Sequence, residues 1–187
     1  IVSMLTHTMT IAGLKRDLPI CRVNDELYIG AFVIFGDVEL TVACARDLLA
    51  KAPKDYDYMI SAESKGIPLV YEMARQAGQN KWFLARKSAK LYMQNVFSVE
   101  VKSITTSASQ KLYLDGADAE MMRGKRILIV DDVISTGESL RAIEELVLKA
   151  GGIIAGRMAI LAEGDAQERA DITYFEKLPV LNAKGEV

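Results

Sequence analysis

The chain reads Ile-Leu-Ile-Val-Asp-Asp-Val-Ile-Ser-Thr-Gly-Glu-Ser from Ile127 to Ser139, and this stretch decides the fold. It begins with apolar, mostly β-branched residues, a pattern typical of a central parallel strand that is covered on both faces. The strand is expected to end at Asp131 and Asp132. A turn of small residues follows, and apolar residues then recur at helical spacing over residues 138–149. The stretch therefore predicts a buried strand, an acidic edge, a turn and a helix.

Both halves of this stretch suit a phosphorylated sugar. Open parallel sheets bind ligands at the carboxyl ends of their strands, so Asp131 and Asp132 are expected to face a crevice, where carboxylates accept hydrogen bonds from hydroxyl groups. The turn over residues 135–139 lies at a helix start, whose unpaired N–H groups and positive dipole end attract anions. Gly137 lets the backbone approach an oxygen closely. Hydroxyl side chains in the same turn add donors: Ser135, Thr136 and Ser139.

The segment 130–139 closely resembles the 5-phosphoribosyl-1-pyrophosphate (PRPP) motif of type I phosphoribosyltransferases. Two other phosphate-binding patterns, Gly-x-x-x-x-Gly-Lys-Ser/Thr and Gly-x-Gly-x-x-Gly, are absent from the sequence. The resemblance implies an α/β fold with a doubly wound, mostly parallel sheet. It also implies that Asp131 and Asp132 hold the ribose hydroxyls, and that residues 135–139, Glu138 included, anchor the 5′-phosphate.

A second strand, turn and helix is predicted over residues 58–76, and its turn carries a cation. Lys65 beside Gly66 at a helix entrance is arranged for an anion. The segment Ser-Ala-Glu-Ser-Lys-Gly that contains both residues resembles the pyrophosphate loop of purine phosphoribosyltransferases. That resemblance implies a cis peptide bond before Lys65, and it adds Glu63 and Ser64 to Lys65 and Gly66 as PRPP-binding residues.

Further cations follow the next predicted strand, Lys81–Ala85. Arg86 and Lys87 come directly after it, with Lys90 nearby. Because the carboxyl ends of parallel strands share one edge of a sheet, these side chains are expected at the same crevice. The segment from Ala85 to Lys90 resembles the Arg/Lys-rich stretch of adenine and xanthine phosphoribosyltransferases. The resemblance implies that these cations help to hold pyrophosphate.

Two β-rich stretches, Phe97–Lys102 and Gln110–Leu114, flank a hydroxyl-rich segment over residues 103–109. Small polar residues are typical of a mobile loop. In type I enzymes the corresponding hairpin is a flexible flap that closes over PRPP and excludes water. The segment lacks the Glu-Tyr pair of familiar adenine enzymes, and it looks more like xanthine phosphoribosyltransferases and related purine-operon regulators. The accepted base therefore stays open at this point.

Length and composition fit a single phosphoribosyltransferase domain of 187 residues, in which residues 1–36 correspond to the family's hood over the base and residues 37–187 to the PRPP-binding core. The formal charge of −2 argues against a nucleic-acid partner. No apolar run reaches the roughly 18 residues of a membrane span, so we expect no membrane partner and a cytoplasmic protein. Cys21 and Cys44 lack metal or disulfide spacing and are interpreted as core thiols.

The sequence thus predicts a purine phosphoribosyltransferase that transfers 5-phosphoribose from PRPP to a purine base, with adenine favoured, and releases pyrophosphate. The predicted catalytic residues are Asp131, Asp132, Lys65 and Arg86. The resemblance implies a homodimer, and Mg²⁺ that is bound mainly through PRPP, with Asp131 or Asp132 as the protein groups able to touch it. A xanthine or hypoxanthine/guanine transferase and a PRPP-sensing regulator without chemistry are the alternatives.

Overall fold

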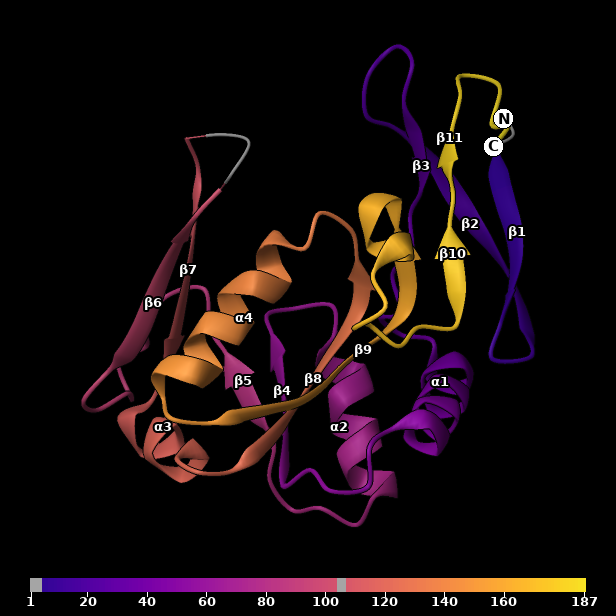
Figure 1. Ribbon diagram of the computed structural model, residues 1–187. Helices are drawn as coiled ribbons and strands as arrows, with labels where there is room; N and C mark the ends of the chain where they lie inside the picture. The colour runs from indigo at the N-terminus through magenta and orange to yellow at the C-terminus, as the bar shows by residue number, and fades with distance from the viewer. Residues whose placement is uncertain (1–4, 104–106) are drawn as a thin grey trace.

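Figure 1 shows the computed structural model of the chain, which describes residues 5–103 and 107–187. In this part of the chain a parallel sheet has the strand order β10-β9-β8-β4-β5. Its strands are β4 (Tyr58–Ala62), β5 (Phe83–Ala85), β8 (Arg126–Ile134), β9 (Ile153–Glu163) and β10 (Glu176–Leu178). The apolar run that opens the deciding stretch lies in β8, the middle strand. The predicted doubly wound α/β fold is confirmed.

Helices cover both faces of this sheet (Figure 1): α1 (Val38–Lys51), α2 (Ile67–Gln76), α3 (Gly116–Met122) and α4 (Glu138–Lys149). Successive side chains of a strand point to opposite faces, so β8 contributes to two cores. Leu128 and Val130 pack with α1 and α2, whereas Ile127 and Ile129 pack with α3 and α4. Each of these side chains is fully buried, which stabilises the fold by about 1.5–3 kcal/mol per residue. This two-sided burial explains why β8 begins with an uninterrupted apolar run.

The two ends of the chain meet in a second sheet, which is antiparallel and has the order β1-β2-β3-β11. Its strands are β1 (Thr6–Ile11), β2 (Leu14–Arg22), β3 (Tyr28–Gly30) and β11 (Val180–Leu181). The strand β11 comes from the C-terminal part of the chain and pairs with β3 (Figure 1). Ala12 and Gly13 take positive φ values and turn the chain between β1 and β2.

The segment predicted to form the flap is a hairpin of β6 (Phe97–Lys102) and β7 (Ser109–Leu114), in register from Phe97↔Leu114 to Lys102↔Ser109. Two cations of α4 fasten β6 to the helix. Arg141 Nη2 donates to the carbonyl oxygen of Lys102 at 2.9 Å, and Lys149 Nζ donates to that of Ser98 at 2.7 Å. The middle of the hydroxyl-rich segment, residues 104–106, lies outside the described residues, so the predicted mobility of this loop stays a prediction.

One smaller expectation is wrong. The Cys21 thiol is exposed rather than in the core. Cys44 is buried as expected, and burial raises the pKa of its thiol to about 12, so it stays protonated at neutral pH. In the described residues no helix is long and apolar enough to span a membrane.

Candidate active site

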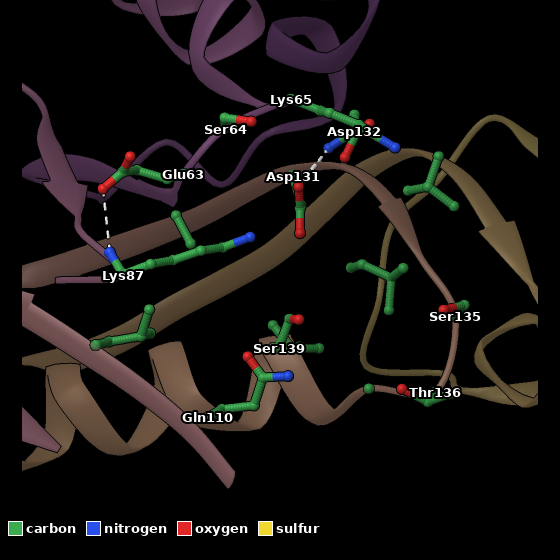
Figure 2. A pocket seen from close by; sticks show the side chains of 16 residues that line it. Glu63, Ser64, Lys65, Lys87, Gln110, Asp131, Asp132, Ser135, Thr136 and Ser139 are labelled. Carbon is green, nitrogen blue, oxygen red and sulfur yellow. Dashed lines mark hydrogen bonds between the residues drawn. The ribbon is translucent and has the colours of Figure 1, made fainter. Parts of the chain in front are cut away.

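The carboxyl edge of β4 and β8 is hollowed into a cleft of about 250 Å³ (Figure 2). Its walls come from the loop between β4 and α2, the loop between β8 and α4, and part of β7. Most of the predicted site residues line it: Glu63, Ser64, Lys65, Lys87, Asp131, Asp132, Ser135, Thr136, Gly137 and Ser139. The remaining predicted residues stand outside the lining that the described residues form: Gly66, Arg86, Lys90 and Glu138.

The strand β8 runs farther than its apolar stretch predicts, and this places the two carboxylates. Pairing with β4 stops at Ile60↔Ile129, whereas pairing with the long strand β9 continues to Ile134↔Ala162. Asp131 and Asp132 therefore lie inside β8 rather than after it, at positions where β4 no longer covers the strand. As neighbours on a strand they project in opposite directions, and Figure 2 shows the Asp131 carboxylate pointing into the cleft on the side of Lys87.

The carboxylate pair is short of positive charge. Burial and the neighbouring Asp132 raise the pKa of Asp131 well above its usual range, and Lys87 opposes the shift only in part. The Asp132 side chain is only 6% exposed, and the Asp132 N–H donates to Asp131 Oδ1 at 2.8 Å. A ligand that brings hydroxyl donors or a cation to this point would lower the free-energy cost of keeping two acidic groups close together in a partly buried site.

The turn after β8 has the geometry of an anion site. Gly137 is the N-cap of α4 and takes φ +81°, a left-handed conformation that glycine adopts at little cost. The Thr136 hydroxyl accepts from the Glu138 N–H at 3.3 Å, while the N–H groups of Gly137 and Ser139 keep no partner in the described residues. The Glu138 side chain turns away from the cleft, because its carboxylate accepts a hydrogen bond from the Ser103 hydroxyl on the hairpin.

The loop after β4 approaches β8 very closely at Gly66. A β-carbon on this residue would lie 2.5 Å from Ser61 Oγ and 3.3 Å from Asp131 Oδ1. Only glycine therefore fits between the two strands, although Gly66 does not itself line the cleft. The loop contains a cis peptide bond, as the resemblance implies, but it joins Glu63 to Ser64 and so lies one residue earlier than the expected bond before Lys65.

Two of the predicted cations are engaged elsewhere. Arg86 Nε donates to Glu63 Oε1 at 2.6 Å, and the Arg86 guanidinium also donates to the Tyr92 hydroxyl. Burial alone would raise the pKa of Glu63, but hydrogen bonds from Arg86 and from the Lys87 backbone lower it. Lys90 Nζ donates to Ser88 Oγ at 2.9 Å. Lys65 and Lys87 are consequently the predicted cations that reach the cleft.

Sequence reasoning missed the contribution of the hairpin to this cleft. Gln110 and Leu112 of β7 line it, and Figure 2 shows the Gln110 amide across from Ser139. No local motif marks either residue. Their position follows from the packing of the hairpin on α4, which is a long-range arrangement that a single segment does not encode.

A family model described as the phosphoribosyl transferase domain matches residues 41–182, about three quarters of the chain. The chain belongs to the phosphoribosyltransferase family. The match contains both strand–turn–helix units and the cations after β5, so the predicted family is confirmed. In this chain the motif Val-Asp-Asp-Val-Ile-Ser-Thr-Gly-Glu-Ser supplies the two carboxylates near one end of a short segment and the turn before α4 near the other.

Curated relatives of this chain differ in the base that their names give. The adenine phosphoribosyltransferase of Rubrobacter xylanophilus is 35% identical over 127 residues, which are 67% of this chain and 65% of that protein. The hypoxanthine/guanine phosphoribosyltransferase of Methanohalobium evestigatum is 28% identical over 127 residues, 68% of this chain and 63% of that protein. The chain thus matches just under two thirds of the length of these relatives.

Solved structures with the same fold include two named adenine phosphoribosyltransferases. The protein of Thermoanaerobacter pseudethanolicus has a TM-score of 0.63 at 23% identity and covers 78% of this chain and 84% of its own. The protein of Rhodothermus marinus has a TM-score of 0.62 at 18% identity and covers 92% and 94%. At such low identity these likenesses establish the shared fold.

Proposed function

We propose that this protein transfers 5-phosphoribose from PRPP to a ring nitrogen of a purine, forming a nucleoside monophosphate and pyrophosphate. One observation carries the proposal. The cleft is lined by two cations, Lys65 and Lys87, by the carboxylates of Asp131 and Asp132, and by the turn at the α4 N-terminus. PRPP presents complementary groups, because it joins a pyrophosphate, a ribose diol and a 5′-phosphate in one molecule.

The reaction requires a departing pyrophosphate and a ribose carbon that becomes cationic. Lys65 and Lys87 would stabilise the charge that develops on the pyrophosphate. Asp131 and Asp132 would hold the ribose hydroxyls, and their negative field would favour the cationic sugar. Backbone N–H groups of residues 135–139 would fix the 5′-phosphate and so position the reacting carbon. In the geometry described above Arg86 acts indirectly, by holding Glu63 of the pyrophosphate loop.

The donor set at the cleft fits Mg²⁺. This ion prefers oxygen ligands and is usually held by one or two carboxylates together with substrate phosphates. Asp131 and Asp132 offer such oxygens, and the described residues contain no group of three or more histidine, cysteine, aspartate or glutamate side chains that could hold the ion alone. When bound with PRPP, Mg²⁺ would neutralise part of the pyrophosphate charge.

Adenine is the base that we propose. The support is the adenine phosphoribosyltransferase name of relatives at 35% identity, against 28% for the hypoxanthine/guanine relative. The family resemblance also leads us to propose a homodimer in the cytoplasm, which light scattering behind a sizing column and cell fractionation would test.

Release of pyrophosphate tests the proposed function. The protein is incubated with Mg²⁺, PRPP and, in separate reactions, adenine, hypoxanthine, guanine, xanthine, uracil or orotate. We expect fastest release with adenine and none without Mg²⁺. Fastest release with another purine would change the proposed base but not the proposed reaction class. Tight PRPP binding without release of pyrophosphate for any base would contradict the transferase and favour a PRPP-sensing regulator.

A further inference from the structure

An arginine from outside the predicted site lies against the phosphate-binding turn. Arg169 follows the short helix η1 (Gly164–Glu168), which comes directly after β9. A β-carbon on Gly137 would lie 3.1 Å from Arg169 Nη1, and no other described residue apart from its chain neighbours comes within 4 Å of that point. The guanidinium therefore lies beside the N-terminus of α4, although Arg169 is not one of the residues that line the cleft.

Asp171 fixes the direction in which this guanidinium points. Arg169 Nε donates to Asp171 Oδ1 at 2.9 Å, and Arg169 Nη2 donates to Asp171 Oδ2 at 2.7 Å. Such a two-pronged pair uses one edge of the planar guanidinium and leaves Nη1 on the opposite side. Nη1 is the atom that lies beside Gly137. Asp171 thus presents the unused N–H groups of Arg169 to the turn.

A second arginine shares the same acidic partners without reaching the turn. Arg157 of β9 pairs with Glu144 of α4 at 3.3 Å and with Asp171 at 3.8 Å. Arg169 also approaches Glu144, at 3.8 Å. Both arginines therefore take part in the ion pairs that involve Glu144 of α4 and Asp171 after β9. They differ in that Arg169 alone approaches Gly137, which makes Arg157 a matched control.

We propose that Arg169 is a further residue of the 5′-phosphate subsite and that Asp171 is its positioning residue. This inference rests on the proposed function, because it assumes that the α4 N-terminus binds the phosphate of PRPP. The backbone N–H groups of the turn are neutral donors, and a phosphate monoester carries nearly two negative charges at neutral pH. A guanidinium at this end supplies the opposite charge that the turn itself lacks, and it donates charge-assisted hydrogen bonds to phosphate oxygens.

Ligands that differ in the 5′-phosphate separate this role from a purely structural one. Ribose 5-phosphate contains the group that Arg169 would bind. Inorganic pyrophosphate would bind at Lys65 and Lys87 instead. Calorimetry measures the binding of each ligand to the wild-type protein and to the variants Arg169→Met, Arg157→Met and Asp171→Asn. Thermal melting of each variant reports the cost of breaking the ion pairs.

We expect Arg169→Met to weaken ribose 5-phosphate binding about tenfold or more, the usual effect of losing a hydrogen bond to a charged group. Asp171→Asn should weaken it by a smaller factor, since the guanidinium stays but loses its orientation. Arg157→Met should change it less than about threefold, and pyrophosphate should bind all variants like the wild type. Unchanged ribose 5-phosphate binding by Arg169→Met would overturn the proposal, and so would equal weakening by Arg157→Met.

The outcome is distinguishable from failure of the proposed function. If the wild type binds ribose 5-phosphate through Arg169 but releases no pyrophosphate from PRPP with any base, the transferase proposal fails and the Arg169 proposal stands. If the wild type transfers phosphoribose and Arg169→Met binds ribose 5-phosphate normally, the Arg169 proposal fails alone. A wild-type protein that does not bind ribose 5-phosphate overturns the subsite itself.

Discussion

Helices α1 and α3, which begin away from the cleft, start differently from α2 and α4, which begin at it. The Asp37 carboxylate caps α1 by accepting from the Leu40 N–H at 3.1 Å, and Asp115 caps α3 by accepting from the Ala117 N–H at 3.3 Å. The N-caps of α2 and α4 are Gly66 and Gly137, which have no side chain. An aspartate N-cap stabilises a helix by about 0.5–2 kcal/mol. The cleft helices lack this stabilisation.

The two cleft helices also differ from each other. The first donors of α2 are already occupied, since the Ile67 N–H donates to the Ser64 carbonyl at 3.2 Å and Pro68 has no N–H. The positive charge beside the N-terminus of α2 therefore comes mainly from the side chain of Lys65. At α4 the N–H groups of Gly137 and Ser139 stay available within the described residues. The proposed pyrophosphate site accordingly consists of side-chain cations, and the proposed 5′-phosphate site of backbone donors.

An aspartate N-cap on α4, of the kind that α1 has, should produce the largest effect, which is a loss of PRPP affinity. In Gly137→Asp, a carboxylate would occupy the N-terminus and repel the 5′-phosphate. Juxtaposed like charges cost several kcal/mol, so PRPP affinity should fall on the order of 10³-fold. Gly137→Asn is the matched control, because asparagine has the same shape, tolerates positive φ and carries no charge. Calorimetry with PRPP should find Asn much closer to the wild type, and equal affinities for the two variants would show that the phosphate binds elsewhere.

Removing the cation of the α2 end should have the next largest effect. Lys65→Ala deletes a charge that stabilises the departing pyrophosphate, so turnover should fall about 10²-fold or more. Lys90→Ala provides the comparison, since the sequence predicts both lysines at the site but Lys90 Nζ binds Ser88 Oγ outside the cleft lining. Steady-state rates of pyrophosphate release measure both. A larger loss for Lys90 than for Lys65 would reverse the assignment.

Replacing the carboxylate of Asp131, which lies between the two helix ends, should lower activity and raise the stability of the ligand-free protein. Asp131→Asn should lower turnover by about 10²-fold, because the field on the cationic sugar weakens. Burial and Asp132 raise the pKa of Asp131, so the folded protein holds the ionised group unfavourably. Its contribution to stability is present below the ordinary carboxylate pKa and is lost as pH rises through the raised pKa.

Ligand-free Asp131→Asn should consequently melt at a higher temperature than the wild type at pH 7. The difference should shrink toward zero as the pH falls below about 4, where the unfolded carboxylate also becomes protonated. Melting curves across this pH range check the sign. A variant less stable than the wild type at pH 7 would contradict the proposed cause of the pKa shift.

Local chemistry explains which of these features the sequence predicts. The buried apolar run of β8 depends on a few neighbouring residues, and it is confirmed. The features that escape prediction depend on distant partners. The end of β8 is set by the length of β9, the direction of the Arg86 side chain by Glu63, and the position of Arg169 by the segment after β9.

The smallest effect should come from a cap outside the cleft. Asp115→Ala removes the acceptor for the Ala117 N–H and should destabilise the protein by about 1 kcal/mol, which lowers the melting temperature by roughly 2–4 °C for a chain of this size. Asp115→Asn should restore most of the loss, because asparagine caps nearly as well. PRPP affinity and turnover should stay at the wild-type level in both variants, since α3 begins away from the cleft. If Asp115→Ala lowered PRPP affinity as strongly as Gly137→Asp, the distinction between capped and ligand-binding helices would be wrong. Both kinds of helix start would then act on the site.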